Sequence, residues 1–120
     1  MRSILTVAAL SVALAGAALA QDRVYEIGNG VKSPVLIKEV KPNYTAGAMR
    51  RKVEGIVEMQ VVVLADGAVA DDVKITRSLD DELDQEAIKA VKQWKFRPGT
   101  KDDYPVAVQV NVEMSFHLKK

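Results

Sequence analysis

Cysteine is absent from the 120 residues, which excludes disulfides, a cysteine nucleophile and cysteine-ligated metal sites. The only histidine, His117, falls on the polar face of the last predicted strand, where a solvated surface role is favoured over a catalytic or ligand role. No base stands out near any serine, and no glycine-rich phosphate loop is present. We therefore expect no enzymatic activity and no cofactor.

Metal-ligand spacing is missing as well. The acidic stretch DDELDQE, residues 80–86, resembles a calcium loop only superficially, because it lacks the glycine at the sixth position and the alternating ligands of such a loop. A helix N-terminus explains the same residues, since acidic side chains are favourable at the positive end of the helix dipole. We expect no metal site.

Aromatic residues are scarce, at 5% of the chain, and the single Trp94 lies in the stretch AVKQWKFRP, residues 90–98. Aromatic side chains interleaved with cations are typical of single-strand nucleic-acid binders. The charge balance argues against that function. Arg2 belongs to the N-terminal segment described in the next paragraph, and without it the 17 basic residues become 16 and equal the 16 acidic ones. Trp94 also falls on a helical apolar stripe with Leu83 and Val91. We predict no nucleic-acid partner and a core position for Trp94.

The first twenty residues contain no proline and are strongly apolar. Arg2 precedes an apolar run from Ile4 to Ala15, and Ala18–Ala20 form a small-x-small cleavage site before Gln21. The apolar run is shorter than the roughly 20 residues needed to span a bilayer. We predict a cleaved signal peptide over residues 1–20 and a periplasmic location; the alternative is an uncleaved anchor in the inner membrane.

The rest of the chain predicts one modest domain. Residues 21–34 are polar and contain Gly28-Asn29-Gly30, which indicates a flexible lead-in, and the domain is expected over residues 35–120. Val35–Val40 is expected to be a strand or an extended arm. Residues 45–52 are expected to form a short helix with Thr45 as its N-cap.

Two strands are predicted around a turn at Ala65–Gly67. In the first, Gly55–Leu64, alternate residues share an apolar face. The second is expected to run from Val69 to Arg77.

A helix is predicted to begin in the acidic stretch and to end near residues 94–96, because Pro98 cannot continue it. The strand predicted after it, Val106–Leu118, has the most regular alternation in the chain. These patterns predict an α+β, two-layer sandwich with an antiparallel sheet. The predicted core includes Val57, Met59, Val61, Leu83, Val91, Trp94, Phe96 and Phe116.

Six short motifs, in order, resemble those of the C-terminal domain family of TonB-type energy transducers. They cover about residues 35–118, and the one nearest the family signature is A-V-x-x-W-x-F-x-P. The others are Pro42–Tyr44, the E-G-x-V at Glu54–Val57, the D-G-x-V at Asp66–Val69, the S…L-D-x-x-A between Ser78 and Ala87, and Tyr104–Val106.

The resemblance implies a three-stranded antiparallel sheet with two helices on one face and a non-enzymatic role in TonB-dependent transmembrane transport. In this family, the domain binds a short peptide, the TonB box, in the plug of an outer-membrane receptor. The peptide pairs with the last strand near the opening motif, a mode of binding called strand addition. The positions that the resemblance assigns to partner binding are Pro42, Asn43, Tyr44, Val106, Val108, Gln109, Val110, Asn111, Val112 and Glu113.

The sequence departs from full-length transducers because it has four prolines and no proline-rich spacer. Three functions therefore stay open. The first is a periplasmic domain that binds extended segments of outer-membrane receptors or other envelope proteins. The second is a structural or scaffold domain that self-associates as a strand-exchanged homodimer. The third is a membrane-anchored energy transducer, should residues 1–20 be retained.

Overall fold

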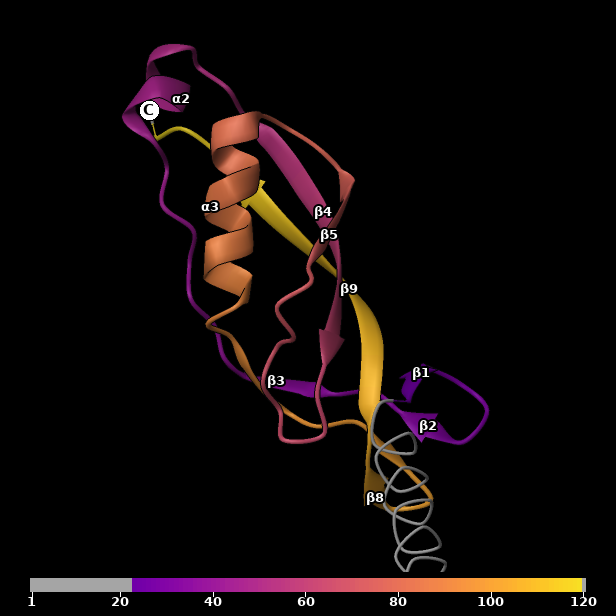
Figure 1. Ribbon diagram of the computed structural model, residues 1–120. Helices are drawn as coiled ribbons and strands as arrows, with labels where there is room; N and C mark the ends of the chain where they lie inside the picture. Colours follow the sequence, from indigo (N-terminus) through magenta and orange to yellow (C-terminus); the bar gives the residue numbers. More distant parts are fainter. Residues whose placement is uncertain (1–22, 120) are drawn as a thin grey trace, which may run out of the picture.

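The computed structural model describes residues 23–119, so the predicted signal peptide lies outside the described residues. The main sheet has the strand order β1-β9-β4-β5 (Figure 1). Its centre is an antiparallel pair of long strands, β4 (Gly55–Val63) and β9 (Ala107–Phe116), in register over nine residue pairs. β5 (Lys74–Arg77) lies beside β4, and β1 (Val24–Glu26) pairs with β9 in parallel.

Alternation along the two long strands places one face of the sheet in the core. Val57, Met59, Val61 and Val63 of β4 are buried, whereas the residues that alternate with them are only half-buried. In β9, Val112 and Phe116 are buried. Met114 between them is buried as well, whereas Glu113 and Ser115 are exposed, so the predicted period-2 pattern of these strands is confirmed.

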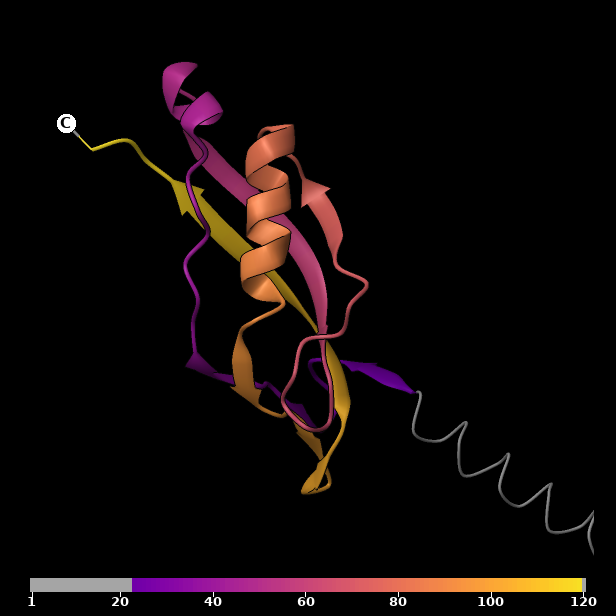
Figure 2. The same ribbon diagram turned by 60° about the vertical axis from the view of Figure 1, so that its left-hand side comes forward.

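Helix α3 (Asp81–Val91) covers this apolar face (Figure 2). Its N-cap is Asp80, whose carboxylate accepts hydrogen bonds from the backbone N–H groups of Glu82 and Leu83. The helix ends three residues before the predicted boundary at residues 94–96. The chain tightens there, because the N–H groups of Gln93 and Trp94 bond to carbonyls three residues earlier instead of four.

After this tight turn, the chain forms a short strand that the sequence pattern did not predict. β6 (Lys95–Arg97) pairs antiparallel with β3 (Val35–Lys38), the predicted strand or arm. Two further strands, β7 (Thr100–Lys101) and β8 (Tyr104–Pro105), form a hairpin. Strands of two to four residues carry too little alternation to be recognised from sequence.

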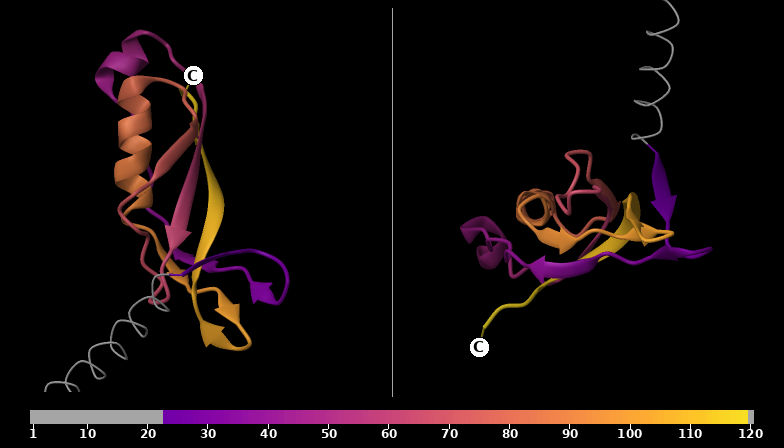
Figure 3. Two further views of the ribbon diagram at one scale, coloured as in Figure 1. Left: turned by 45° about the vertical axis from the view of Figure 1, so that its right-hand side comes forward. Right: turned by 90° about the horizontal axis from the view of Figure 1, so that it is seen from below.

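Helix α2 (Ala46–Arg50) lies beyond the N-terminal end of α3 (Figure 3). Thr45 caps it as predicted, accepting a hydrogen bond from the N–H of Ala48, and also donates a hydrogen bond to Glu82 at 2.6 Å. α2 therefore closes one end of the core, while α3 alone covers the face of the sheet.

The strand predicted at residues 69–77 is shorter in the structure. Val69 makes a single bridge to Val63, and regular pairing resumes only at Lys74. Between them the chain folds on itself, with the N–H of Val73 bonded to the carbonyl of Asp71. β4 and the segment from Val69 to Arg77 thus form a wide, irregular hairpin and not a continuous ladder of backbone hydrogen bonds.

The region expected to be a flexible lead-in also differs. Its described part, residues 23–34, contains β1 and also β2 (Val31–Lys32), which pairs with β7. The expected three-stranded antiparallel sheet is accordingly a four-stranded mixed sheet, accompanied by two smaller sheets. The cause is that short N-terminal segments pair with strands from the other end of the chain. No helix within residues 23–119 has the length and apolarity needed to cross a membrane.

Candidate functional site

The most distinctive surface of the domain is the outer edge of β9. β1 pairs with residues 107–109 at one end of this edge. Beyond Gln109, no other strand of the described chain pairs with this side of β9, so residues 110–116 form an open edge. Open edges of this kind carry unpaired backbone donors and acceptors.

The hydrogen bonds of the neighbouring hairpin show which backbone groups point outward. In an antiparallel sheet, successive residues direct their N–H and C=O groups to opposite neighbours. The carbonyl of Val62 accepts from the N–H of Ala70 at 2.9 Å, and the N–H of Leu64 donates to the carbonyl of Ala68 at 2.8 Å. The even-numbered residues of β4 therefore face β5, and its odd-numbered residues face β9.

The register carries this alternation across to β9. Odd-numbered residues of β4 lie opposite even-numbered residues of β9, as in the pair Val57 and Met114. The odd-numbered residues of β9 must then direct their backbone groups away from β4. On the open part of the edge these residues are Asn111, Glu113 and Ser115, and all three side chains are exposed.

Two cavities run beside this edge, and together we call them the edge groove. The first has a volume of about 350 Å³ and lies between the segment Glu39–Tyr44 and residues 113–117. The second has a volume of about 400 Å³ and borders residues 110–113. Trp94 lines both cavities, so they adjoin along the same strand.

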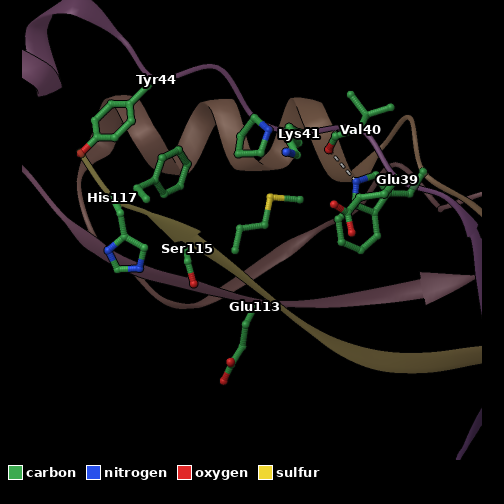
Figure 4. Close-up of a pocket in the computed structure, with 11 residues that line it drawn as sticks. Glu39, Val40, Lys41, Tyr44, Glu113, Ser115 and His117 are labelled. Atoms are coloured by element: carbon green, nitrogen blue, oxygen red, sulfur yellow. Dashed lines mark hydrogen bonds between the residues drawn. The ribbon is translucent and has the colours of Figure 1, made fainter. Parts of the chain in front are cut away.

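Tyr44 fixes one end of the first cavity (Figure 4). Its ring packs edge-on against Phe116, with ring centroids 5.6 Å apart and planes at 84°. Its hydroxyl donates a hydrogen bond to the carbonyl of Val53. Burial raises the pKa of Tyr44, and the nearby carboxylate of Glu54 adds to the effect. Tyr44 therefore stays a neutral donor and holds the segment before α2 against the end of β9.

Trp94 fixes the middle of the groove. Its indole N–H donates a hydrogen bond to the carbonyl of Val40 at 2.8 Å, drawn as a dashed line in Figure 4. The ring is 8% exposed and lies 6.2 Å from Phe96 between centroids. The tight turn after α3 thus positions the indole where it both completes the core and forms part of the groove wall.

Charged side chains surround the groove without forming a reactive cluster. Glu39, Lys41 and Glu113 line the first cavity, and Glu113 points away from the segment Val40–Tyr44 (Figure 4). Among the described residues, no group of three or more histidine, cysteine or acidic side chains is arranged to hold a metal ion. The chemistry that the groove offers is backbone pairing flanked by apolar contact.

The structure brings many of the residues predicted for partner binding to this groove. Pro42, Tyr44 and Glu113 line the first cavity; Val110, Asn111, Val112 and Glu113 line the second. The other four lie elsewhere. Asn43 lines neither cavity, and Val106 borders a separate cavity with Tyr25. Val108 is fully buried, and Gln109 is paired with Glu26 of β1.

Sequence reasoning missed several groove residues. The second cavity is also lined by Ile27 and Leu36, which are 53% and 38% exposed. The apolar run from Val35 to Val40 was the available signal, but a short run does not reveal which face it presents. Trp94 was predicted only as a core residue, and it also lines both cavities. The eight residues predicted for the core are all buried, namely Val57, Met59, Val61, Leu83, Val91, Trp94, Phe96 and Phe116.

Known proteins have related sequences. A family described as "Gram-negative bacterial TonB protein C-terminal" matches residues 40–118. Protein TonB of Vibrio cholerae is 34% identical over 90 residues, which cover 74% of this chain and 37% of that protein. Protein tonB2 of Pseudomonas aeruginosa is 42% identical over 78 residues, which cover 64% of this chain and 28% of that protein. The chain thus spans about a third of the length of these curated relatives.

Solved structures share the fold. The solution structure of the Pseudomonas aeruginosa TonB C-terminal domain superposes with a TM-score of 0.61 at 24% identity, covering 79% of this chain and 94% of that one. A Helicobacter pylori TonB C-terminal domain superposes with a TM-score of 0.50 at 26% identity, covering 67% of this chain and 84% of that one. Because the family model matches residues 40–118, well over half of its length, the chain belongs to the family of TonB C-terminal domains.

Proposed function

We propose that this domain binds an extended peptide segment, of the TonB-box type, from an outer-membrane receptor or another envelope protein. The segment adds as a strand to the open edge of β9. We place the domain in the periplasm, as a non-enzymatic component linked to TonB-dependent transmembrane transport. The observation that carries the proposal is the open edge at residues 110–116, flanked along its length by the edge groove.

Backbone pairing would supply the affinity. The outward N–H and C=O groups of Asn111, Glu113 and Ser115 have the spacing of a strand, so an extended peptide can bond to each in turn. Such bonds need no particular side chain in the peptide. This supports recognition of an extended segment and gives a role to the regular alternation of β9.

Side-chain contacts would supply the selectivity. Alternate residues of an added strand point to opposite faces of the sheet. On one face they meet the groove walls, where Tyr44, Trp94 and Leu36 offer apolar surface. On the other face they lie beside the exposed side chains of Asn111 and Glu113. An alternating apolar and polar peptide fits this arrangement best.

The direct test is a backbone NMR titration with synthetic peptides copied from the N-terminal plug segments of outer-membrane receptors. We expect chemical-shift changes at residues 110–116 and at Val40–Tyr44. β5 is an internal control, because it forms the opposite edge of the same sheet. Changes that are absent from β9, or that occur at β5 instead, would contradict strand addition.

A pair of variants at one position separates backbone pairing from side-chain contact. Glu113→Pro removes an outward N–H that the domain's own ladder does not use, and proline is tolerated on strand edges of this kind. Glu113→Ala removes the side chain but keeps the N–H. We expect Glu113→Pro to weaken peptide binding by roughly tenfold, corresponding to about 1.4 kcal/mol, and Glu113→Ala to bind nearly as the parent does. Equal binding by the two variants would contradict the proposed mode.

The periplasmic location rests on cleavage before Gln21. N-terminal sequencing of the protein recovered from cells tests this point. A chain that begins at Gln21 supports the periplasmic domain, whereas a chain that keeps residues 1–20 supports the anchored energy transducer instead.

A further inference from the structure

β1 lies on the edge that the proposed partner would use. By the alternation described above, Ala107 and Gln109 direct their backbone groups to the same side as Asn111, Glu113 and Ser115. These five residues form one continuous row, which we call the edge row. β1 lies opposite the first two positions, where Val24 pairs with Ala107 and Glu26 with Gln109. The chain therefore already adds a short strand of its own to this edge.

The contacts that hold β1 in place are few. It spans three residues, of which Val24 and Glu26 are exposed and only Tyr25 is half-buried. Tyr25 packs under two cations, with Arg23 at 5.2 Å and Lys101 at 5.0 Å from the ring centroid. Cation–π contacts at exposed sites contribute modestly. A strand with this little buried surface can detach without disturbing the core.

The chain turns away from the edge directly after β1. Gly28, Asn29 and Gly30 all have positive φ, at 112°, 52° and 84°, and form a tight turn that leads into β2. Ile27, just before this turn, lines the second cavity together with Val110. β1 thus ends where the edge groove begins, and a partner strand that extended past Val110 would meet it.

We propose that β1 is an intramolecular competitor that occupies the first part of the edge row and limits access to it. This inference rests on the proposed strand addition. With β1 docked, a partner has only Asn111, Glu113 and Ser115; with β1 released, it has the whole row. The N-terminal segment thereby regulates the affinity of the domain for its partner.

The fraction of molecules in which β1 is docked determines how much the partner's affinity falls. The apparent dissociation constant of a partner rises in inverse proportion to the fraction of molecules that are free to bind it. If β1 is docked nine-tenths of the time, a partner that needs the whole row binds about tenfold more weakly than it would to a free edge.

A reversible lock tests the proposal. The chain has no natural cysteine, so the double variant Val24→Cys with Ala107→Cys can form only one intramolecular disulfide. The two residues are directly paired, and neighbouring strands lie about 4.8 Å apart, within the Cα separation that a disulfide bridges. The oxidised protein holds β1 on the edge, and reduction of the same sample allows it to detach again. The Ala107→Cys single variant controls for the change at the buried position.

Binding is measured by NMR titration with the receptor plug peptides. We expect the oxidised protein to bind at least about tenfold more weakly than the reduced protein. A variant with glycine at all three β1 positions (Val24→Gly, Tyr25→Gly, Glu26→Gly) should bind more tightly than the parent. Equal affinities of the oxidised, reduced and glycine forms would overturn the role of β1 while leaving strand addition intact. Absence of binding by every form would overturn strand addition and this inference together.

Discussion

At the scale of single residues, Trp94 has two roles, one in the core and one at the surface. Its ring belongs to the buried core, and its indole N–H fixes the segment at Val40. The same ring lines the edge groove. A residue just after a helix can serve core and surface together, because the tight turn there buries most of the side chain and leaves a small part of it exposed.

Truncation of Trp94 should therefore cost stability. We expect Trp94→Ala to lower the free energy of unfolding by on the order of 3 kcal/mol, through lost burial and the remaining cavity. Trp94→Phe should cost less, because an aromatic ring still fills the site and about 1 kcal/mol is attributable to the lost hydrogen bond. Urea unfolding followed by circular dichroism measures both, since these variants have no other tryptophan for fluorescence. An alanine variant as stable as the parent would contradict the core role.

Asp80 predicts a specific dependence of stability on pH. Its hydrogen bond to the Arg51 guanidinium, at 2.6 Å, is the main reason that the pKa of Asp80 lies below its ordinary value. A lowered pKa in the folded state stabilises the protein above the unfolded pKa of about 4, and this contribution is lost as pH falls through the folded pKa. Acid should therefore weaken the link between α2 and the start of α3.

The variant Asp80→Asn isolates the charge, because asparagine caps a helix as well as aspartate does. We expect this variant to melt below the parent at neutral pH. The gap should close as pH falls toward about 2, where the parent carboxyl is also neutral. Thermal melts across this range provide the measurement. A gap that stays constant with pH would show that the charge of Asp80 does not contribute.

At the scale of elements, the hairpin between β4 and β5 depends on a contact outside itself. Gly67 has a φ of 88° in the turn, as its position after Asp66 predicts. Its carbonyl also accepts a hydrogen bond from the N–H of Phe96 at 2.9 Å. A Cβ on Gly67 would lie 2.0 Å from the Phe96 carbonyl oxygen. The turn is therefore docked against β6, which is part of the frame that holds Trp94.

Because of this contact, we expect Gly67 and Gly30, which have similar backbone angles, to differ in how much stability an alanine substitution costs. Gly67→Ala should lower the free energy of unfolding by at least about 2 kcal/mol, because backbone strain and the clash with Phe96 act together. Gly30→Ala should cost only about 1 kcal/mol, since Gly30 has a φ of 84° but no atom within 4 Å of the added methyl. Chemical unfolding of both variants provides the comparison. Equal losses would show that the docking contact has no energetic effect.

At the scale of the whole molecule, the open edge also permits a second candidate function. Two copies could pair through β9, as the self-associating alternative requires. We expect the protein to remain monomeric as its concentration rises, because only three outward positions are open on each copy. Light scattering over a wide concentration range tests this. A dimer that forms with concentration and disappears in Glu113→Pro would favour assembly over peptide binding.

The sequence predicted the long elements well and the short ones poorly. The alternation in β4 and β9 and the cap of α2 at Thr45 were recognisable, because local pattern and chemistry define them. β1, β2 and β6 were not recognisable. Each is three residues or shorter, and each exists because a distant segment supplies its hydrogen-bond partner. For the same reason, residues 23–34 looked like a flexible lead-in.

The sequence by itself determined the family, the buried face of each long strand and the nearly neutral, cysteine-free character of the chain. These properties follow from side-chain order, which is local. Only the tertiary structure decided which part of β9 is open, which residues border it and that β1 already lies on its first positions. Those features depend on how segments more than 80 residues apart meet, as Val24 and Ala107 do, and no local pattern encodes such a pairing.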